Sequence, residues 1–425
     1  MTMTMTGQAD AAPTTAASPD TPVPQRAGPR PLGLQILLGA SGLFGAFGAL
    51  GPMLAGALPW DDALSDEAED LRRQILSLDQ GKFMAALAGE TQNRLAAMLE
   101  GMRRYQNHGY RRDLPAVPVL STAGSARLLD YGEAGKPAVL VIPSLINRAY
   151  ILDLTAERSF LRWLAGQGFR PLLVDWGAPG DAESHFGFDA YIGDILTGFL
   201  RMAGNIQGGR VPLVGYCMGG TLAVALAALH PGHIAALALL ATPWDFHADQ
   251  AMATRILNLQ QPMLRRIIKG AGTIPVDLLQ AYFAALDPTQ AQRKFAAFAR
   301  MPADSARARQ FVALEDWLND GVPLAGPLAL QVLEQWYGAN LPQTGQWRIG
   351  DTAIRPERLD VPALIAMPRG DRIVPTASSQ ALADALPQVH RLHPDSGHIG
   401  MVVGSGAIAN LWSPLADWLR EVSSG

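Results

Sequence analysis

The sequence predicts an α/β protein: a mostly parallel, doubly wound sheet, a helical cap inserted into it and a helical N-terminal extension. Two observations support this fold class. From residue 117 to residue 246, apolar runs of strand length alternate with runs of helical spacing. Such alternation produces parallel strands joined by helices on both faces of a sheet. Residues 247–355 interrupt the alternation with helical sequence, and two further apolar runs follow.

The composition sets limits on the function. The 425 residues are 48% hydrophobic and 17% charged, which is enough apolar sequence for a large buried core. The net charge is −4 and no long basic run occurs, so we expect no nucleic-acid partner. The single cysteine excludes an internal disulfide and fits a reducing compartment. Cys and His show no zinc-binding spacing, and we expect neither a metal nor a cofactor.

The first 113 residues divide into three parts. Residues 1–30 are rich in Met, Thr, Ala and Pro, and we expect a disordered tail because they cannot form a core. Residues 31–59 are hydrophobic and Gly-rich, without a charge from Leu32 to Leu58. This length would span a bilayer, although recurrent glycines and Pro52 lower its helix propensity. Residues 60–113 have apolar residues at helical spacing, which predicts a helical extension packed on the core or on a partner.

The α/β core is expected in two parts, residues 114–246 and 356–425, separated by the helical cap at 247–355. The expected strands are Val117–Leu120, Ala126–Tyr131, Ala138–Pro143, Pro171–Trp176, Val211–Val214, Ile234–Leu240, Val361–Met367 and Val389–His393. The expected helices are Ser159–Gln167, Phe188–Ala203 and Thr221–Leu229. Several strands are apolar throughout, as burial on both faces of a parallel sheet requires.

Gly215-x-Cys217-x-Gly219 lies between an expected strand and an expected helix. A nucleophile on such a sharp turn needs small residues two positions before and after it, because its own backbone is strained. The N–H groups that begin the following helix favour a thiolate and an oxyanion. By itself the pattern also fits a Gly-rich turn with a buried cysteine.

Two further residues occur in the order that a catalytic triad needs. Asp371 lies in a loop after the strand at 361–367, and His398 follows the strand at 389–393. Nucleophile, acid and histidine in this chain order are typical of α/β hydrolases. We therefore expect Cys217, Asp371 and His398 to form the triad of that fold. Asp395 is the competing acid, but it lies only three residues before His398 and lacks a strand-end loop.

Five motifs resemble those of the polyhydroxyalkanoate (poly-3-hydroxybutyrate) synthases, a family of the α/β-hydrolase superfamily. The lipase-like box of that family resembles G-Y-C-M-G-G-T at 215–221. Its other motifs are similar to L-I-N-R-A-Y-I-L-D-L at 145–154, T-P-W-D-F at 242–246, D-R-I-V-P at 371–375 and S-G-H-I at 396–399. The resemblance extends from about residue 100 to the end of the chain.

The chain departs from the family pattern at three positions. Leu145 stands where the family has tryptophan, Arg148 where it has lysine, and Trp244 where it has a small residue. In length the chain falls between the long synthases that act as one subunit and the short ones that need a second subunit. These differences concern the substrate and the subunit class more than the chemistry.

The resemblance implies an acyltransferase that polymerises (R)-3-hydroxyacyl-CoA into polyhydroxyalkanoate and releases CoA through an acyl group on Cys217. His398 would take the Cys217 proton and then activate the incoming 3-hydroxyl group. Asp371 would orient His398 and stabilise its imidazolium form.

The same resemblance implies roles for the remaining site residues. The backbone N–H groups of Met218 and Ile146 would form the oxyanion hole, an interaction worth about 3–4 kcal/mol per donor in other acyl-transfer enzymes. Asn147 and Tyr216 would bind the substrate.

Two other functions fit the same motifs. The first is hydrolysis, by an intracellular polyester depolymerase or a thioesterase with this triad. Cysteine favours transfer, because water is a poor nucleophile towards a sheltered thioester. The second is a granule-associated scaffold without turnover, anchored by residues 32–58.

The implied partners are the acyl-CoA substrate, the growing polyester, a second copy of the chain and, as in the short members of the family, an activating subunit. We expect a cytoplasmic enzyme on polymer granules, with peripheral membrane contact as a further option. Arginines before Leu32 would favour an N-in spanning helix and place the enzyme outside the cytoplasm, which conflicts with the use of CoA. We therefore expect residues 32–58 to lie on a lipid or polymer surface or to pack on the core.

Overall fold

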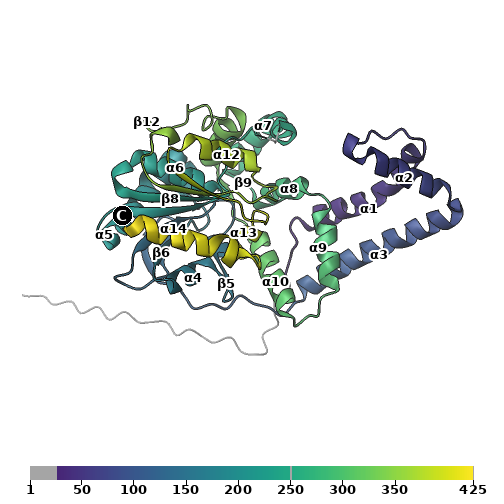
Figure 1. Cartoon of the computed structure of the whole chain (residues 1–425), viewed down its shortest axis with the longest axis horizontal. Coiled ribbons are helices and arrows are strands. Elements are labelled where there is room, and N and C mark those ends of the chain that lie inside the picture. Colours follow the sequence, from purple (N-terminus) through teal and green to yellow (C-terminus); the bar gives the residue numbers. More distant parts are fainter. Residues whose placement is uncertain (1–25, 249–250, 425) are drawn as a thin grey trace, which may run out of the picture.

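An eight-stranded sheet forms the centre of the computed structural model, which describes residues 26–248 and 251–424 (Figure 1). The strand order is β1-β2-β6-β3-β7-β8-β13-β14. These strands are β1 (Val119–Ala123), β2 (Ala126–Asp130), β3 (Ala138–Ile142), β6 (Arg170–Asp175), β7 (Val211–Tyr216), β8 (Ile234–Leu240), β13 (Ala363–Ala366) and β14 (Val389–Leu392). Only the pairings of β1 with β2 and of β2 with β6 are antiparallel. The expected mostly parallel sheet is confirmed.

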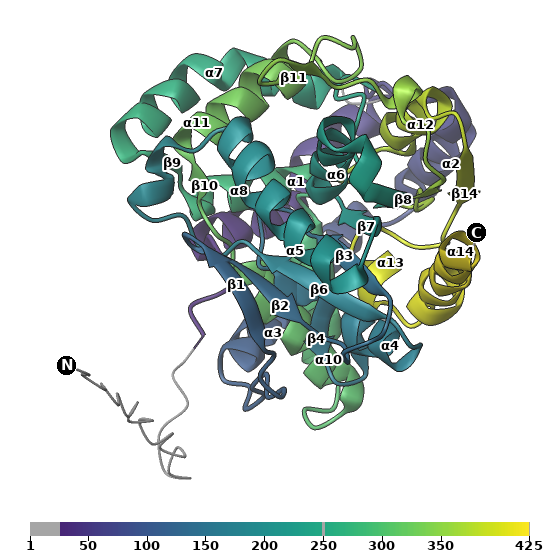
Figure 2. The same cartoon turned by 90° about the vertical axis from the view of Figure 1, so that its left-hand side faces the viewer.

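Helices cover both faces of this sheet, as Figure 2 shows. One face packs against η4 (Asp189–Leu196), α5 (Thr197–Gln207) and α6 (Met218–Leu229). The other face packs against α4 (Phe160–Gly166), α13 (Gly400–Val403), η8 (Ile408–Trp412) and α14 (Ser413–Ser424). Every residue of β3 and β7 is buried. Their continuous apolar sequence therefore matches burial between two helical layers.

The cap is inserted between β8 and β13. Its helices are α7 (Ala251–Ala271), α8 (Val276–Leu286), α9 (Gln290–Ala299), α10 (Ala306–Asn319), α11 (Gly326–Gln331) and η6 (Val332–Gly338). Three short strand pairs stand apart from the main sheet: β4 (Asp153–Thr155) with β5 (Arg158–Ser159), β9 (Thr273–Ile274) with β10 (Leu324–Ala325), and β11 (Arg348–Ile349) with β12 (Thr352–Ala353). The core also contains α12 (Thr376–Ala385) and the short helices η3 (Ala182–His185), η5 (Pro231–His233) and η7 (Pro356–Arg358).

The N-terminal helices form an arm that projects from the rest of the molecule (Figure 1). The arm consists of α1 (Leu32–Leu54), α2 (Ser65–Leu76) and α3 (Gln80–Gln106). Its base packs on the cap through a separate apolar cluster that includes Met98 and Tyr105 of α3 with Phe295 and Val312 of the cap. Gly101 makes this contact close, because a Cβ there would collide with the Phe295 carbonyl oxygen.

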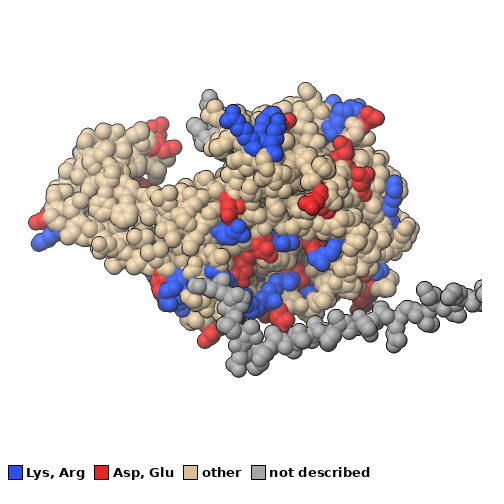
Figure 3. All heavy atoms as spheres, turned by 180° about the vertical axis from the view of Figure 1, so that it is seen from behind, with Lys and Arg blue, Asp and Glu red and all other residues tan. Residues whose placement is uncertain are grey.

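The outer part of the arm exposes apolar side chains. In the described chain, thirteen large apolar residues are exposed, and nine of them belong to the arm or its connecting loops. The nine are Leu37, Phe44, Trp60, Leu64, Leu71, Leu76, Leu78, Met84 and Leu99. Figure 3 shows few charged side chains on the visible face of the arm, where they form small groups at its edges. Among the described helices, α1 is the one that is long and apolar enough to cross a membrane.

The last residues of the expected disordered tail, 26–30, precede α1 and contact the cap. Residues 1–25 lie outside the described part of the chain, but Arg26 is ordered against α10, where its guanidinium group lies 2.5 Å from Asp316. The backbone N–H of Arg30 donates to Asn319 Oδ1 at 2.6 Å. Both contacts join residues nearly 290 positions apart, so the composition of the tail gave no sign of them.

Candidate active site

Cys217 occupies a strained turn between β7 and α6. Its φ is 54° and its ψ is −128°, a backbone conformation that L-residues rarely adopt. The Cys217 N–H donates to the Leu240 carbonyl oxygen of β8 at 2.8 Å, which holds the turn against the neighbouring strand. This is the elbow that the sequence pattern predicts, with the cysteine side chain at the C-terminal edge of the sheet.

The glycines around Cys217 allow the turn to close. A Cβ at Gly219 would collide with the Ile142 carbonyl oxygen, and one at Gly215 would collide with Gly220 of the following helix. Side chains at these positions would therefore push α6 away from the sheet. The small residues are needed for packing as well as for backbone conformation.

His398 and Asp371 lie together in the structure. Nδ1 of His398 is 2.7 Å from Oδ2 of Asp371, and both side chains are almost completely buried. The other carboxylate oxygen, Oδ1, accepts hydrogen bonds from the Ile373 and Val374 N–H groups at 2.8 and 2.9 Å. These bonds fix the acid in one orientation. The competing acid, Asp395, is exposed to solvent.

The environment of His398 favours its charged form. Burial lowers the pKa of His398, but the charge on Cys217 and the hydrogen bonds with Asp371 and Cys217 outweigh it and raise the pKa from 6.5 to about 10. His398 is therefore an imidazolium at neutral pH, placed between the sulfur of Cys217 and the carboxylate of Asp371.

Tyr216 is buried beside the histidine. Its hydroxyl donates to the His398 carbonyl oxygen at 3.3 Å, and the two ring centroids are 5.3 Å apart. Burial, reinforced by the nearby charges of Cys217 and Asp371, raises the pKa of Tyr216 well above its ordinary value, so the phenol is neutral. Tyr216 lines the cavity, but its hydrogen bond serves to position the histidine loop.

The two backbone N–H groups that are expected to form the oxyanion hole, those of Met218 and Ile146, differ in whether they already have a hydrogen-bond acceptor. Met218 is the first residue of α6, and its N–H is one of the four that a helix leaves without an intrahelical acceptor. The Ile146 N–H donates to Ser144 Oγ in a long bond of 3.3 Å. An oxyanion at this position would have to compete with the Ser144 hydroxyl.

Asn147 is held where the loop after β3 meets the cap. It forms an isolated antiparallel bridge with Gly321, and its side chain lines the cavity. Its Oδ1 atom is buried, and no described residue donates a hydrogen bond to it. A buried acceptor without a partner is costly, so a ligand that supplies a donor would be bound favourably here.

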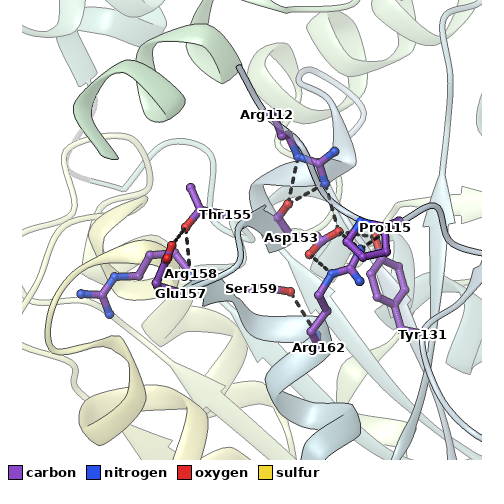
Figure 4. Close-up of polar contacts among 9 residues, drawn as sticks. All are labelled: Arg112, Pro115, Tyr131, Asp153, Thr155, Glu157, Arg158, Ser159 and Arg162. Atoms are coloured by element: carbon purple, nitrogen blue, oxygen red, sulfur yellow. Dashed lines mark hydrogen bonds and ion pairs between the residues drawn. The ribbon is translucent and has the colours of Figure 1, made fainter. Parts of the chain in front are cut away.

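A buried aspartate anchors the end of this loop (Figure 4). The loop continues through η2 (Ala149–Leu152) to Asp153, whose side chain is 1% exposed. Asp153 accepts from Arg112 at 3.0 Å, from Arg162 at 2.8 and 3.1 Å, and from the Tyr131 hydroxyl at 3.1 Å. These bonds tie the loop that carries Ile146 and Asn147 to α4 and to the segment after the arm.

A cavity of about 510 Å³ lies between the core loops and the cap. From the core it is lined by Cys217, His398, Asn147 and their neighbours, and from the cap by residues of α8, α9 and α10. Trp317 of α10 holds the two parts together, because its indole N–H donates to the Arg148 carbonyl oxygen at 2.7 Å. The sulfur therefore opens into a space roofed by the cap, which can exclude water from a bound acyl group.

Sequence reasoning missed the polar residues that the cap contributes. Lys294 and Glu315 form an ion pair in the cavity wall at 2.8 Å. Arg372, which follows Asp371, reaches Asp287 of the cap at 2.8 Å. Of these residues only Glu315 left a trace in the sequence, since it interrupts an otherwise apolar helical stripe, and its partner could not be identified from that pattern.

The chain is similar to known proteins over most of its core. A family model described as the alpha/beta hydrolase fold matches residues 137–405. The poly(3-hydroxyalkanoate) polymerase subunit PhaC of Synechocystis sp. is 30% identical over 296 residues, which cover 67% of this chain and 77% of the relative. The PhaC subunit of Haloferax mediterranei is 30% identical over 289 residues, or 67% of this chain.

The matched segments are shorter than some of the relatives. The alignments cover 59% of the Haloferax mediterranei subunit and 61% of that of Haloarcula marismortui, which is 29% identical. Among solved structures, a thermophilic esterase from Thermogutta terrifontis is 20% identical, with a TM-score of 0.44 over 72% of this chain and 97% of its own. By the family model and the Synechocystis relative, the chain belongs to the α/β-hydrolase fold and, within it, to the family of poly(3-hydroxyalkanoate) polymerase PhaC subunits.

Proposed function

We propose that this chain polymerises (R)-3-hydroxyacyl-CoA into polyhydroxyalkanoate and releases CoA. The observation that supports the proposal most strongly is a cysteine at a strained elbow, beside a buried His398–Asp371 pair, that opens into a capped cavity. The printed name of its relatives, poly(3-hydroxyalkanoate) polymerase, supports the same reaction.

The first step transfers the acyl group from CoA to the enzyme. The sulfur of Cys217 attacks the thioester carbonyl carbon, and the carbonyl oxygen becomes an oxyanion facing the N–H groups of Met218 and Ile146. The bond from carbon to the CoA sulfur then breaks, and His398 gives its proton to the departing CoA thiolate. One thioester replaces another, so this step is close to balanced in free energy.

The second step forms the ester bond. Neutral His398 accepts the proton of the 3-hydroxyl group of a second acyl-CoA, and the hydroxyl oxygen attacks the acyl carbon on Cys217. The ester bond forms, the Cys217 thiolate leaves, and His398 is again an imidazolium beside it. Cys217 is the only cysteine of the chain. Within one chain, the lengthened product must therefore leave as a CoA thioester and return to the same sulfur.

The proposal extends to the surface on which the enzyme works. We infer that the exposed apolar residues of the arm contact the polyester product. Residues 61–70, next to α1, include six acidic and no basic side chains. Interfacial helices that bind anionic membranes are usually basic, so this charge favours an uncharged polymer surface.

The test measures free CoA and insoluble polymer together, from purified protein and (R)-3-hydroxybutyryl-CoA, with Cys217→Ala as the control. We expect CoA and polymer in equivalent amounts from the native protein and neither from the variant. CoA accompanied only by soluble 3-hydroxybutyrate would identify a thioesterase. Absence of both products, from a protein that still binds polymer granules, would favour the scaffold.

A further inference from the structure

Three cap helices each present one face to the active-site cavity. On α10 the lining residues include Phe311, Leu314, Glu315 and Leu318, which follow helical spacing. The α9 residues are Gln290 and Lys294, and the α8 residues are Gln280, Phe283 and Leu286. The roof is therefore largely apolar, and the pair of Lys294 with Glu315 is one of two ion pairs among the described residues that line the cavity, the other being Arg372 with Asp287.

The ion pair is well formed and poorly solvated. Lys294 Nζ lies 2.8 Å from Oε1 and 2.9 Å from Oε2 of Glu315. The Glu315 side chain is 3% exposed and that of Lys294 is 23% exposed. Replacing such a buried pair with apolar residues is often neutral or stabilising. Stability alone therefore gives no reason for charges on an apolar cavity wall, whereas binding of a polar ligand does.

The pair retains hydrogen-bonding capacity for a ligand. An ammonium group has three N–H donors, and two suffice for the bonds to Glu315. The carboxylate has about four lone-pair sites, and Lys294 occupies two of them. One donor and one acceptor therefore lie side by side. A trans secondary amide points its N–H and its C=O in opposite directions, so a ligand with two amides a few bonds apart complements this arrangement, one amide donating its N–H and the other accepting through its C=O.

We propose that Lys294 and Glu315 bind the two amide groups of the pantetheine arm of the CoA thioester. The N–H of one amide donates to Glu315, and the carbonyl oxygen of the other accepts from Lys294. This inference rests on the proposed function, because it takes acyl-CoA as the substrate. The inference also implies separate paths in the cavity for the CoA thioester and for the polyester. The polyester has only ester oxygens, which are acceptors, along its length, and the carboxylate of Glu315 would repel them.

The residues at the mouth of the cavity also suit entry of the CoA thioester. Arg372 lines the cavity and its side chain is 72% exposed, so it lies where the cavity meets solvent. One N–H group of Arg372 donates to Asp287 of the cap at 2.8 Å, and the other donors of its guanidinium group are suited to a phosphate group of CoA, while Lys294 and Glu315 meet the amide-bearing arm deeper inside.

The experiment compares the native protein with a double variant, Lys294→Met with Glu315→Leu, which leaves no unpaired charge. The control is Arg265→Met with Glu334→Leu, which removes an ion pair on the cap surface, 47% and 41% exposed. Calorimetry measures binding of unreactive S-ethyl-pantetheine. Kinetics compare kcat/KM for 3-hydroxybutyryl-CoA with that for the ethanethiol ester of 3-hydroxybutyrate, which has no amide.

We expect the double variant to bind S-ethyl-pantetheine about tenfold to a hundredfold more weakly, the loss typical of hydrogen bonds to charged groups. Its kcat/KM for the CoA ester falls by a similar factor, mainly through KM, while that for the ethanethiol ester is unchanged. The control variant behaves as the native protein.

Three results would overturn the inference: unchanged S-ethyl-pantetheine affinity, equal loss with both esters, or altered polymer length with an unchanged preference for the CoA ester. The last result would assign the pair to the polymer path. The binding measurement is independent of turnover. A native protein that binds S-ethyl-pantetheine through this pair but makes no polymer would refute the proposed function and retain the site.

Discussion

His398 and Asp371 meet although their loops follow different strands of the sheet. Their side chains are 2.7 Å apart because β13 and β14 are parallel neighbours, so that the loops at their C-terminal ends lie side by side. Two backbone N–H groups then hold Asp371 in place. The topology thus supplies the orientation that a histidine between an acid and a nucleophile requires.

Asp371→Asn is predicted to reduce kcat for CoA release by about 10⁴-fold, the loss that the equivalent change causes in a serine-protease triad. The amide cannot stabilise the imidazolium and favours the wrong tautomer of His398. Steady-state kinetics would measure the loss, with Asp395→Asn as the control. Because Asp395 is exposed, that variant should retain kcat within about twofold. A large loss of kcat in Asp395→Asn instead would contradict the assignment of Asp371 as the acid that orients His398.

The pKa of His398 should depend on Cys217. The raised pKa of about 10 means that the imidazolium persists through neutral pH and loses its proton as the pH rises through about 10. Cys217→Ala removes a charge and a hydrogen bond that raise the pKa, while burial continues to lower it. NMR titration of the His398 ring should therefore show a lower pKa in the variant. An unchanged value would refute the close pairing of sulfur and imidazole.

Gly219→Ala is predicted to lower the free energy of unfolding by about 3 kcal/mol, the upper range for overpacking a well-packed site. The added Cβ would collide with the Ile142 carbonyl oxygen. Urea unfolding would measure the change. The matched control is Gly198→Ala on the exposed side of α5, where a Cβ meets no atom within 4 Å. That variant should be as stable as the native protein or slightly more stable.

Asp153→Ala should destabilise the protein by about 3 kcal/mol, because it leaves two arginines without their buried partner. Removing one partner of a buried ion pair usually costs about 3–5 kcal/mol. We expect the lower end of this range because Arg112 and Arg162 are 35% and 29% exposed. Asp417→Ala removes an exposed pair with Arg420 and should cost less than about 1 kcal/mol. Similar unfolding curves for the two variants would show that Asp153 does not anchor the loop.

Leu37→Gln with Phe44→Gln should weaken binding to polyester granules, because the two side chains are 61% and 52% exposed on α1. Co-sedimentation with granules and with anionic vesicles would measure the effect. Leu259→Gln, at an 81% exposed position of the cap, is the control. Loss of vesicle binding, with granule binding retained, would contradict the proposed polymer contact.

The fold and the places of Cys217, Asp371 and His398 within it were accessible from the sequence for local reasons. Cys217, Asp371 and His398 each follow a strand, and their flanking residues encode the turns. The ion pair of Lys294 with Glu315 was not accessible, because it depends on how α9 and α10 are placed. Likewise, Arg26 meets Asp316 across 290 positions. Patterns within a window reveal elements and turns, whereas contacts between distant polar side chains depend on tertiary packing.

Acyl transfer through Cys217 is tested most directly by the intact mass of the protein after rapid mixing with (R)-3-hydroxybutyryl-CoA and an acid quench. We expect a mass increase by one or more 3-hydroxybutyryl units, located on the peptide that contains Cys217 and absent from Cys217→Ala. The adduct should accumulate in Asp371→Asn only as fast as CoA is released. Polymer formation at the native rate without an acyl group on Cys217, or by the Cys217→Ala variant, would show that Cys217 is not the nucleophile.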